Sequence, residues 1–167
     1  PVAPIELGDR EHFKVHVDAA ADQLFISQPL TGRNSGRASI QISRRILLAD
    51  GTFAGVIVAS VDPQKLSQFY QSLNVGRDGA ISLIGLDGIA RVARGFRSEA
   101  ARANTASNIL ARLEAEAAGS LPIADMGDGI RRLVSYRKVA GLPLAVAVGF
   151  GEEDALDSFY NEALKYI

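Results

Sequence analysis

An internal repeat is the feature that most constrains the fold of this 167-residue chain. The stretch that begins at Arg44 reads RRILLADGTFAGVIVASVD and is followed by LSQFYQSL. The stretch that begins at Arg131 reads RRLVSYRKVAGLPLAVAVGF and is followed by LDSFYNEAL. Because the two stretches lie about ninety residues apart, the repeat predicts two similar modules in tandem.

Each copy of the repeat predicts a strand, a turn, a second strand and an amphipathic helix. In the first copy, residues 38–48 alternate apolar and polar side chains, the sequence ADG suits a hairpin turn, and residues 53–61 are rich in β-branched residues. Residues 62–73 then predict a helix that starts at Asp-Pro. The second copy predicts strands near residues 130–138 and 143–150, followed by a helix with an acidic first turn.

The segment ahead of the second copy completes a module. Residues 78–94 predict a hairpin that turns at LDG, residues 105–119 predict a long helix, and residues 121–125 predict a short strand. The resulting order, β-β-α-β-β-β, predicts an α+β fold in which a five-stranded antiparallel sheet carries helices at one side.

The first copy shows only the last part of this order, namely a short helix at residues 9–17, a strand at LFISQPL and the hairpin. The chain has no initiator Met and no signal-peptide pattern. We therefore expect the first two strands of this module, and their helix, to lie upstream of Pro1 in a longer protein.

Composition excludes several classes of function. The net charge is −1, with 18 basic and 19 acidic side chains, so the chain lacks the field that attracts phosphate backbones and no nucleic-acid partner is expected. The absence of cysteine excludes disulfides, thiolate zinc sites and a thiol nucleophile. The most apolar run, residues 139–150, is too short to span a bilayer.

The motifs DREHF, FISQPLTGRNSG, SIQISRRI, DGTFAGVIVASVDP and GRDGAISLIGLDG follow one another along the chain. In sequence and order they resemble the double Cache sensor regions of bacterial diguanylate cyclases, sensor histidine kinases and chemoreceptors. The resemblance implies tandem PAS-like modules in the periplasm, between two transmembrane helices. It also implies a small ligand in the membrane-distal module and a signal that leaves through the last helix.

The resemblance implies boundaries as well. Residues 1–75 correspond to the C-terminal part of the membrane-distal Cache module, residues 76–151 to the membrane-proximal PAS-like module, and residues 152–167 to a signalling helix that leads to a transmembrane segment. The parent chain is then a bacterial inner-membrane protein that is able to form a homodimer. Its output domain, a diguanylate cyclase or a histidine kinase, lies outside this sequence.

Amino-acid-binding members of the family share an Arg-x-Trp-Tyr motif, a Pro-Tyr-x-Asp motif and an aspartate at the end of the last strand. In REHF, Arg10 matches the arginine, His12 the tryptophan and Phe13 the tyrosine. Asp62 matches the terminal aspartate, but PLTG lacks the Tyr and the Asp of the second motif. The resemblance therefore implies a small carboxylate or another small anion as the ligand, rather than an α-amino acid.

Other roles remain open for this segment. A guanidinium matches a carboxylate bidentately, but Arg10 can instead form a salt bridge with Asp9 or Glu11. His12 and His16 share a helix face and could hold a metal ion with Asp9 or Asp18 as a third ligand. HFKVH lacks the glutamate of HExxH, so no metal or other cofactor is expected. Asp9 is instead a candidate for ligand binding, because it lies next to Arg10. A histidine in the site predicts pH-dependent binding.

The strand at residues 38–48 contains three further candidates. Ser39, Gln41 and Ser43 share one face of the strand, and the isoleucines between them share the other. If the polar face lines the pocket, it supplies hydrogen bonds to a ligand. The alternation itself favours the opposite arrangement, in which the polar face is solvated and the isoleucines fill the core.

Arginines recur where a structural role is expected. Arg44 and Arg45 point to opposite faces of their strand, and the recurrence of the pair at Arg131 and Arg132 favours a role in covering a sheet face or pairing across strands. The arginine-rich stretch at residues 90–104 is expected to be a solvated loop that leads into the helix.

No catalytic motif occurs in the chain: there is no Gly-x-Ser-x-Gly, no cysteine and no carboxylate pair with acid–base spacing. We therefore expect an extracytoplasmic small-molecule sensor and not an enzyme. The alternative is a structural or protein-interaction module of the periplasm that has no small ligand.

Overall fold

The computed structural model describes residues 7–33 and 36–163, with side chains as far as residue 157. The chain divides into two compact units, Pro1–Pro63 (unit 1) and Gln64–Ile167 (unit 2). The family resemblance implied a boundary after residue 75, which would place the helix at residues 63–72 in the first module. That helix packs within unit 2, because Tyr70 is buried and its carbonyl accepts a hydrogen bond of 2.7 Å from Arg94.

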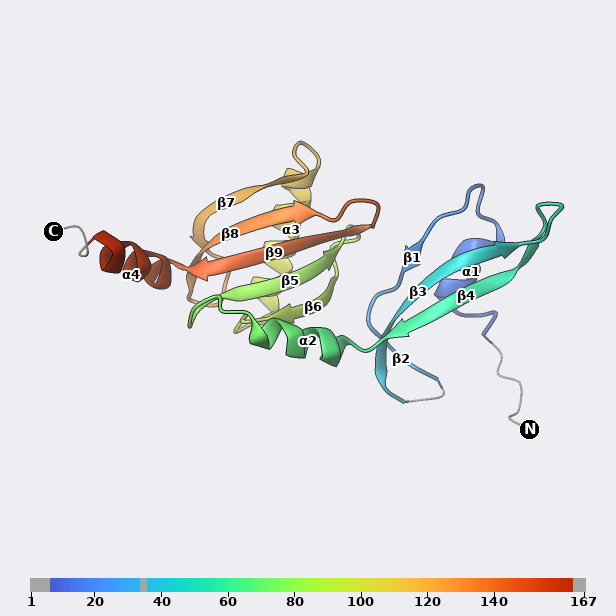
Figure 1. Cartoon of the computed structure of the whole chain (residues 1–167), viewed down its shortest axis with the longest axis horizontal. Helices are drawn as coiled ribbons and strands as arrows, with labels where there is room; N and C mark the ends of the chain where they lie inside the picture. The colour runs from blue at the N-terminus through green and yellow to red at the C-terminus, as the bar shows by residue number, and fades with distance from the viewer. Residues whose placement is uncertain (1–6, 34–35, 164–167) are drawn as a thin grey trace. The chain divides into compact units, whose positions relative to one another are not determined.

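Unit 1 contains one helix and a four-stranded antiparallel sheet in its described residues. Its elements are α1 (Glu11–Val17), β1 (Phe25–Ile26), β2 (Leu30–Thr31), β3 (Ala38–Leu47) and β4 (Phe53–Val61). β1 and β2 pair with consecutive parts of one edge of β3, and β4 pairs with the other edge (Figure 1). Within the residues that the structure describes, the second edge of β4 pairs with no strand.

The predicted strand LFISQPL is interrupted between β1 and β2. The hydroxyl of Ser27 accepts the backbone N–H of Gln41 at 2.9 Å, where a regular ladder would use a carbonyl. Pro29 follows, and it has no N–H to donate to a ladder. Pairing resumes one register step further along, where Leu30 lies opposite Ser39.

The polar face of β3 is buried under α1. Ser39, Gln41 and Ser43 are only 9%, 6% and 1% exposed, and His16 Nε2 lies 2.9 Å from Ser43 Oγ. The arrangement that alternation favoured, with these side chains in solvent, is therefore wrong. The physical reason is that α1 packs its two buried histidines over this face, while Ile40 on the opposite face is buried too.

Unit 2 contains a five-stranded sheet in the order β6-β5-β9-β8-β7, with every neighbouring pair antiparallel (Figure 1). Its elements are α2 (Pro63–Ser72), β5 (Ala80–Gly85), β6 (Ala90–Arg94), α3 (Glu99–Leu113), β7 (Ala118–Asp125), β8 (Arg131–Lys138), β9 (Leu144–Gly151) and α4 (Glu152–Ala163). This confirms the predicted α+β fold. In the described part of the chain, no helix combines the length and apolar character needed to cross a bilayer.

Helix α3 begins earlier than predicted. The hydroxyl of Ser98 caps it by accepting the backbone N–H of Ala101 at 3.0 Å, so the helix covers Glu99–Leu113 and not residues 105–119. Residues 90–104 were expected to form a solvated loop, but they contain strand β6 and the first turns of α3. Because the helix ends sooner, β7 is longer than the predicted strand at residues 121–125.

The two arginine pairs occupy different places in their strands. Arg44 lies in the second half of β3 and binds Asp22 at 2.6 Å. Arg132 lies at the start of β8, where its buried guanidinium binds Asp128 at 2.9 Å and the carbonyl of Asp78 at 2.7 Å. These contacts support the predicted structural role, although the two pairs do not occupy equivalent positions in the two hairpins.

Candidate ligand-binding site

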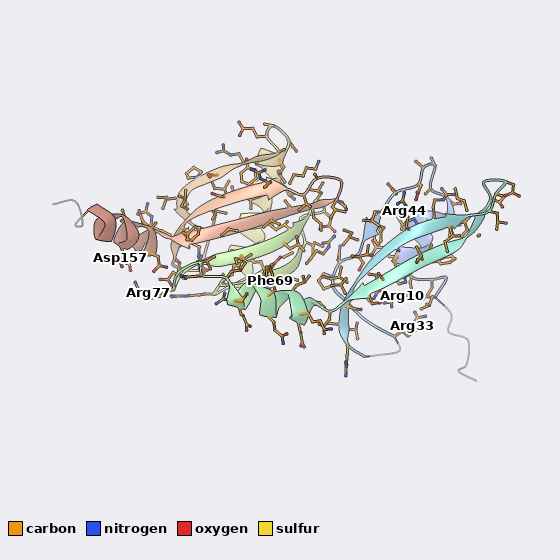
Figure 2. The ribbon with its side chains drawn as sticks, in the orientation of Figure 1. Arg10, Arg33, Arg44, Phe69, Arg77 and Asp157 are labelled. Atoms are coloured by element: carbon orange, nitrogen blue, oxygen red, sulfur yellow. The ribbon has the colours of Figure 1, made fainter. Side chains whose placement is uncertain are left out.

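Unit 1 contains a cavity of about 400 Å³ between the start of α1 and the sheet. The residues that line it are Leu7, Arg10, His12, Leu30, Gly32, Arg33, Ser39, Gln41, Val58 and Ser60. Two of them, Arg10 and Arg33, are labelled in Figure 2. The cavity therefore collects residues from the start of α1, from strands β2, β3 and β4 and from the loop after β2.

Arg10 occupies the N-cap position of α1, where its extended backbone precedes the first helical turn. Its guanidinium lines the cavity and donates one long hydrogen bond, 3.4 Å, to the carbonyl of Thr31. Asp9 pairs with Arg33 instead, and among the described residues no carboxylate forms an ion pair with Arg10. The structure therefore contains no salt bridge from Arg10 to Asp9 or Glu11, and most N–H groups of Arg10 have no acceptor among the described residues.

His12 lies in the first turn of α1, and its side chain lines the cavity while being only 5% exposed. Its Nδ1 atom is buried and has no hydrogen-bond partner within the described residues. Burial lowers the pKa of His12, and the nearby charge of Arg10 lowers that pKa further, so the neutral imidazole is favoured. A buried nitrogen without a partner costs free energy, which a ligand or a water molecule can recover.

Three neutral side chains form the floor of the cavity. The Ser60 hydroxyl donates to Gln41 Oε1 at 2.7 Å, and Gln41 Nε2 donates to Ser39 Oγ at 2.8 Å. Within the described residues, the second Nε2 hydrogen of Gln41 and the hydroxyl hydrogen of Ser39 have no acceptor. The floor therefore offers neutral donors to a bound molecule.

Four sequence-predicted site residues do not line the cavity. Phe13 packs edge-on against Phe53 with ring centroids 5.8 Å apart, and Ser43 bonds to His16. Asp9 is outside the lining and forms an ion pair with the lining residue Arg33. Asp62 follows the last residue of β4 and is not in the lining either.

Two polar residues of the lining were missed by the sequence reasoning. Ser60 lies directly opposite Gln41 in the β3–β4 ladder, so the hairpin register indicates its position once Gln41 is known to face inward. Arg33 comes from the loop after β2, and no local pattern points to it.

The second histidine, His16, faces Ser43 and Phe25 rather than the cavity. In the described residues, no group of three or more His, Asp or Glu side chains is arranged to hold a metal ion.

The corresponding face of the sheet in unit 2 is filled by apolar side chains. Val134 and Tyr136 of β8 pack with Ile109 of α3 and Ile84 of β5 in the core of this unit. Where β3 presents serine and glutamine to its helix, β8 presents valine and tyrosine. The difference places the candidate site in unit 1.

Residues 63–149 match the family model dCache_1-like, which is described as a histidine kinase sensor domain. The match spans more than half of the chain, so the chain belongs to this family. This confirms the Cache resemblance of the motifs. A search of curated proteins found no significant match.

Solved structures with the same fold are extracellular or ligand-binding domains. The extracellular domain of a predicted histidine kinase, rpHK1S-Z16, is 28% identical with a TM-score of 0.74, over 93% of this chain and 65% of that one. A second such domain, mmHK1S-Z3, is 14% identical with a TM-score of 0.70, over 95% and 59% of the two chains. The ligand-binding domain of the Pseudomonas fluorescens chemoreceptor CtaA, in complex with L-alanine, is 17% identical with a TM-score of 0.60, over 93% and 65%. This chain therefore spans less than two thirds of the length of these domains.

Proposed function

We propose that this chain senses a small carboxylate, or another small anion, that binds in the cavity of unit 1. The observation that carries the proposal is that Arg10 lines the cavity and that, within residues 7–33 and 36–163, its guanidinium makes a single long hydrogen bond, to a carbonyl. A carboxylate matches the planar fork of a guanidinium with two parallel hydrogen bonds. His12 and Gln41 stand beside it as further hydrogen-bonding groups.

The charge of the lining favours an anion that has no ammonium group. The described lining contains two arginines and no aspartate or glutamate, and Asp62 is absent from it. The CtaA domain was solved with L-alanine. Among the residues that the structure describes, however, no carboxylate lines the cavity to compensate the charge of an α-ammonium group, whose burial without a partner is costly.

We propose that the signal leaves through α4. Asp154, in the first turn of α4, accepts the backbone N–H of Asp78 at 3.0 Å and binds Arg77 at 3.4 Å. Both partners belong to the segment between α2 and β5. Because α2 follows β4 directly in the chain, a movement of β4 on ligand binding can be passed through α2 to this contact. The ligand changes the populations of the two conformations, signalling and resting, only by the difference between its affinities for them.

We further propose that this region lies in the periplasm and belongs to a bacterial inner-membrane protein whose output domain is a histidine kinase or a diguanylate cyclase. The family and the extracellular domains with the same fold support this placement. Homodimerisation is proposed for the full-length protein. Alkaline phosphatase fused to a full-length protein at this region should be active, and an inactive fusion would contradict the location.

Thermal unfolding with small carboxylates, amino acids, amines and nucleobases tests the function. A ligand at about 100 times its dissociation constant adds roughly 2.7 kcal/mol, which raises Tm by several degrees in a domain of this size. We expect a shift with carboxylates that is lost in Arg10→Ala and kept in Arg44→Ala, whose arginine lies outside the cavity lining. No shift with any compound would favour the alternative of a structural or protein-interaction module.

A further inference from the structure

We propose that the ligand is a short dicarboxylate whose two carboxylates bind Arg10 and Arg33. This inference rests on the proposed function, because it assigns a narrower ligand class to the same cavity. Its basis is that a second arginine lines the cavity from a different segment of the chain. Arg10 lies at the start of α1, whereas Arg33 lies in the loop after β2 (Figure 2).

Arg33 already binds one carboxylate of the chain, in bidentate geometry. Its Nη2 and Nη1 atoms donate to Oδ2 and Oδ1 of Asp9 at 2.7 and 3.1 Å, which is the bidentate geometry that guanidinium groups form with carboxylates. Asp9 itself does not line the cavity, so its carboxylate reaches Arg33 from outside the lining. A ligand carboxylate therefore binds Arg33 by taking the place of Asp9.

The bond between Arg33 and Asp9 is one that a ligand can replace. The two side chains are 43% and 55% exposed, and ion pairs with this much solvent exposure contribute little net stability. On release, the Asp9 carboxylate becomes hydrated at the surface, so no charge is left buried without a partner. Arg10 needs no such exchange with any described residue, because within the described part of the chain its guanidinium makes only the 3.4 Å bond to Thr31.

The rest of the lining suits a short aliphatic chain. Leu30 and Val58 supply apolar surface, and Ser39 and Gln41 supply neutral hydrogen-bond donors. The cavity volume of about 400 Å³ lies near the lower end of the range for small-molecule sites, roughly 300–1,000 Å³. This combination of charge, size and polarity matches a dicarboxylate such as succinate.

Calorimetric titration with succinate and butyrate tests the inference, since butyrate has a methyl group in place of the second carboxylate. We expect the wild-type chain to bind succinate at least about tenfold more tightly than butyrate. Arg33→Gln should bring the two affinities to within about threefold of each other. Asp9→Asn should increase the affinity for succinate and leave that for butyrate unchanged, because it removes a competitor for Arg33 alone.

Arg44→Gln is the matched control, because Arg44 also pairs with an exposed aspartate of unit 1 but lies outside the cavity lining. It should keep the full preference for succinate. Thermal unfolding without ligand shows that each variant is folded.

Equal affinities of the wild-type chain for the two acids, or an unchanged preference in Arg33→Gln, would overturn the dicarboxylate inference and leave carboxylate sensing intact. Tight binding of inorganic phosphate without binding of succinate would overturn it too. Failure of both acids to bind the wild-type chain, with no other carboxylate binding, would overturn the proposed function itself.

Discussion

Gln41 and Ser60 lie directly opposite each other on β3 and β4, and the Ser60 hydroxyl donates a 2.7 Å hydrogen bond to the side-chain oxygen of Gln41. The amide of Gln41 donates in turn to Ser39 at 2.8 Å. These two bonds fix which end of the amide faces each serine. The floor of the cavity is therefore oriented before a ligand arrives, which lowers the entropy cost of binding.

Ser60→Ala should weaken ligand binding without unfolding unit 1. The substitution frees the Gln41 amide to rotate, and ordering one freed side chain on binding costs about 0.5–1.5 kcal/mol, or roughly two- to tenfold in affinity. Tm should change little, because Ser60 is exposed. Calorimetric titration checks the affinity. Ser72→Ala, which removes an exposed hydroxyl bond in unit 2, is the control and should leave the affinity unchanged. An unaltered affinity in Ser60→Ala would contradict the role of the floor.

Lowering the pH should destabilise the chain through His12. The pKa of His12 lies below its ordinary value of 6.5 in the folded chain, because burial and Arg10 disfavour its protonated form. Between that lowered pKa and 6.5, the unfolded chain binds more protons than the folded chain. The free energy of unfolding therefore falls as the pH drops through 6.5 and levels off below the folded-state pKa. Thermal unfolding from about pH 8 to about pH 5.5 measures this slope.

His12→Gln should reduce the slope of unfolding free energy against pH, and equal slopes in the wild-type and variant proteins would rule out His12 as the source.

Ligand affinity should change with pH in the opposite direction to stability. A carboxylate beside the imidazole favours its protonated form, so the affinity for succinate should rise as the pH falls over the same range. A flat affinity would mean that His12 does not contact the ligand.

Arg132→Met should strongly destabilise unit 2. The side chains of Arg132 and Asp128 are 2% and 0% exposed, so loss of the guanidinium leaves a buried carboxylate without its partner. Such a loss costs about 3–5 kcal/mol, which corresponds to a fall in Tm on the order of 10 °C. The control is Arg131→Met: Arg131 is 59% exposed and pairs with Glu152 at the surface, so its removal should cost less than about 1 kcal/mol. Similar Tm values for the two variants would show that the buried pair does not hold the unit together.

Asp154→Ala should separate ligand binding from signalling in a full-length protein. It removes the contacts of α4 with Arg77 and Asp78, and it leaves the cavity of unit 1 intact. We expect unchanged ligand affinity and a loss of the ligand-dependent change in output activity. Glu153→Ala, at the neighbouring exposed position of α4, is the control and should respond normally. A normal response in Asp154→Ala would exclude this contact as the route to the last helix.

Local patterns in the sequence predicted the elements of both units well where periodicity and turn chemistry act over a few residues. The alternation before ADG and the β-branched residues after it placed β3 and β4 almost to the residue. The start of α3 was misplaced, because the Ser98 cap was overlooked. The break in LFISQPL depends on a bond between Ser27 and Gln41, which lie fourteen residues apart in the chain, and this distant contact is not part of the local pattern.

The sequence by itself determined the order of strands and helices, the family, and Arg10 and His12 as candidates, because these depend on short motifs. It also determined that Ser39 and Gln41 share a face of β3, since side chains alternate along any strand. Only the tertiary structure decided that this face lines a cavity and that Arg33 lies at its rim, paired with Asp9. The physical reason is that burial and ion pairing depend on which distant segments pack together, and a strand with period two looks the same whichever of its faces a helix covers.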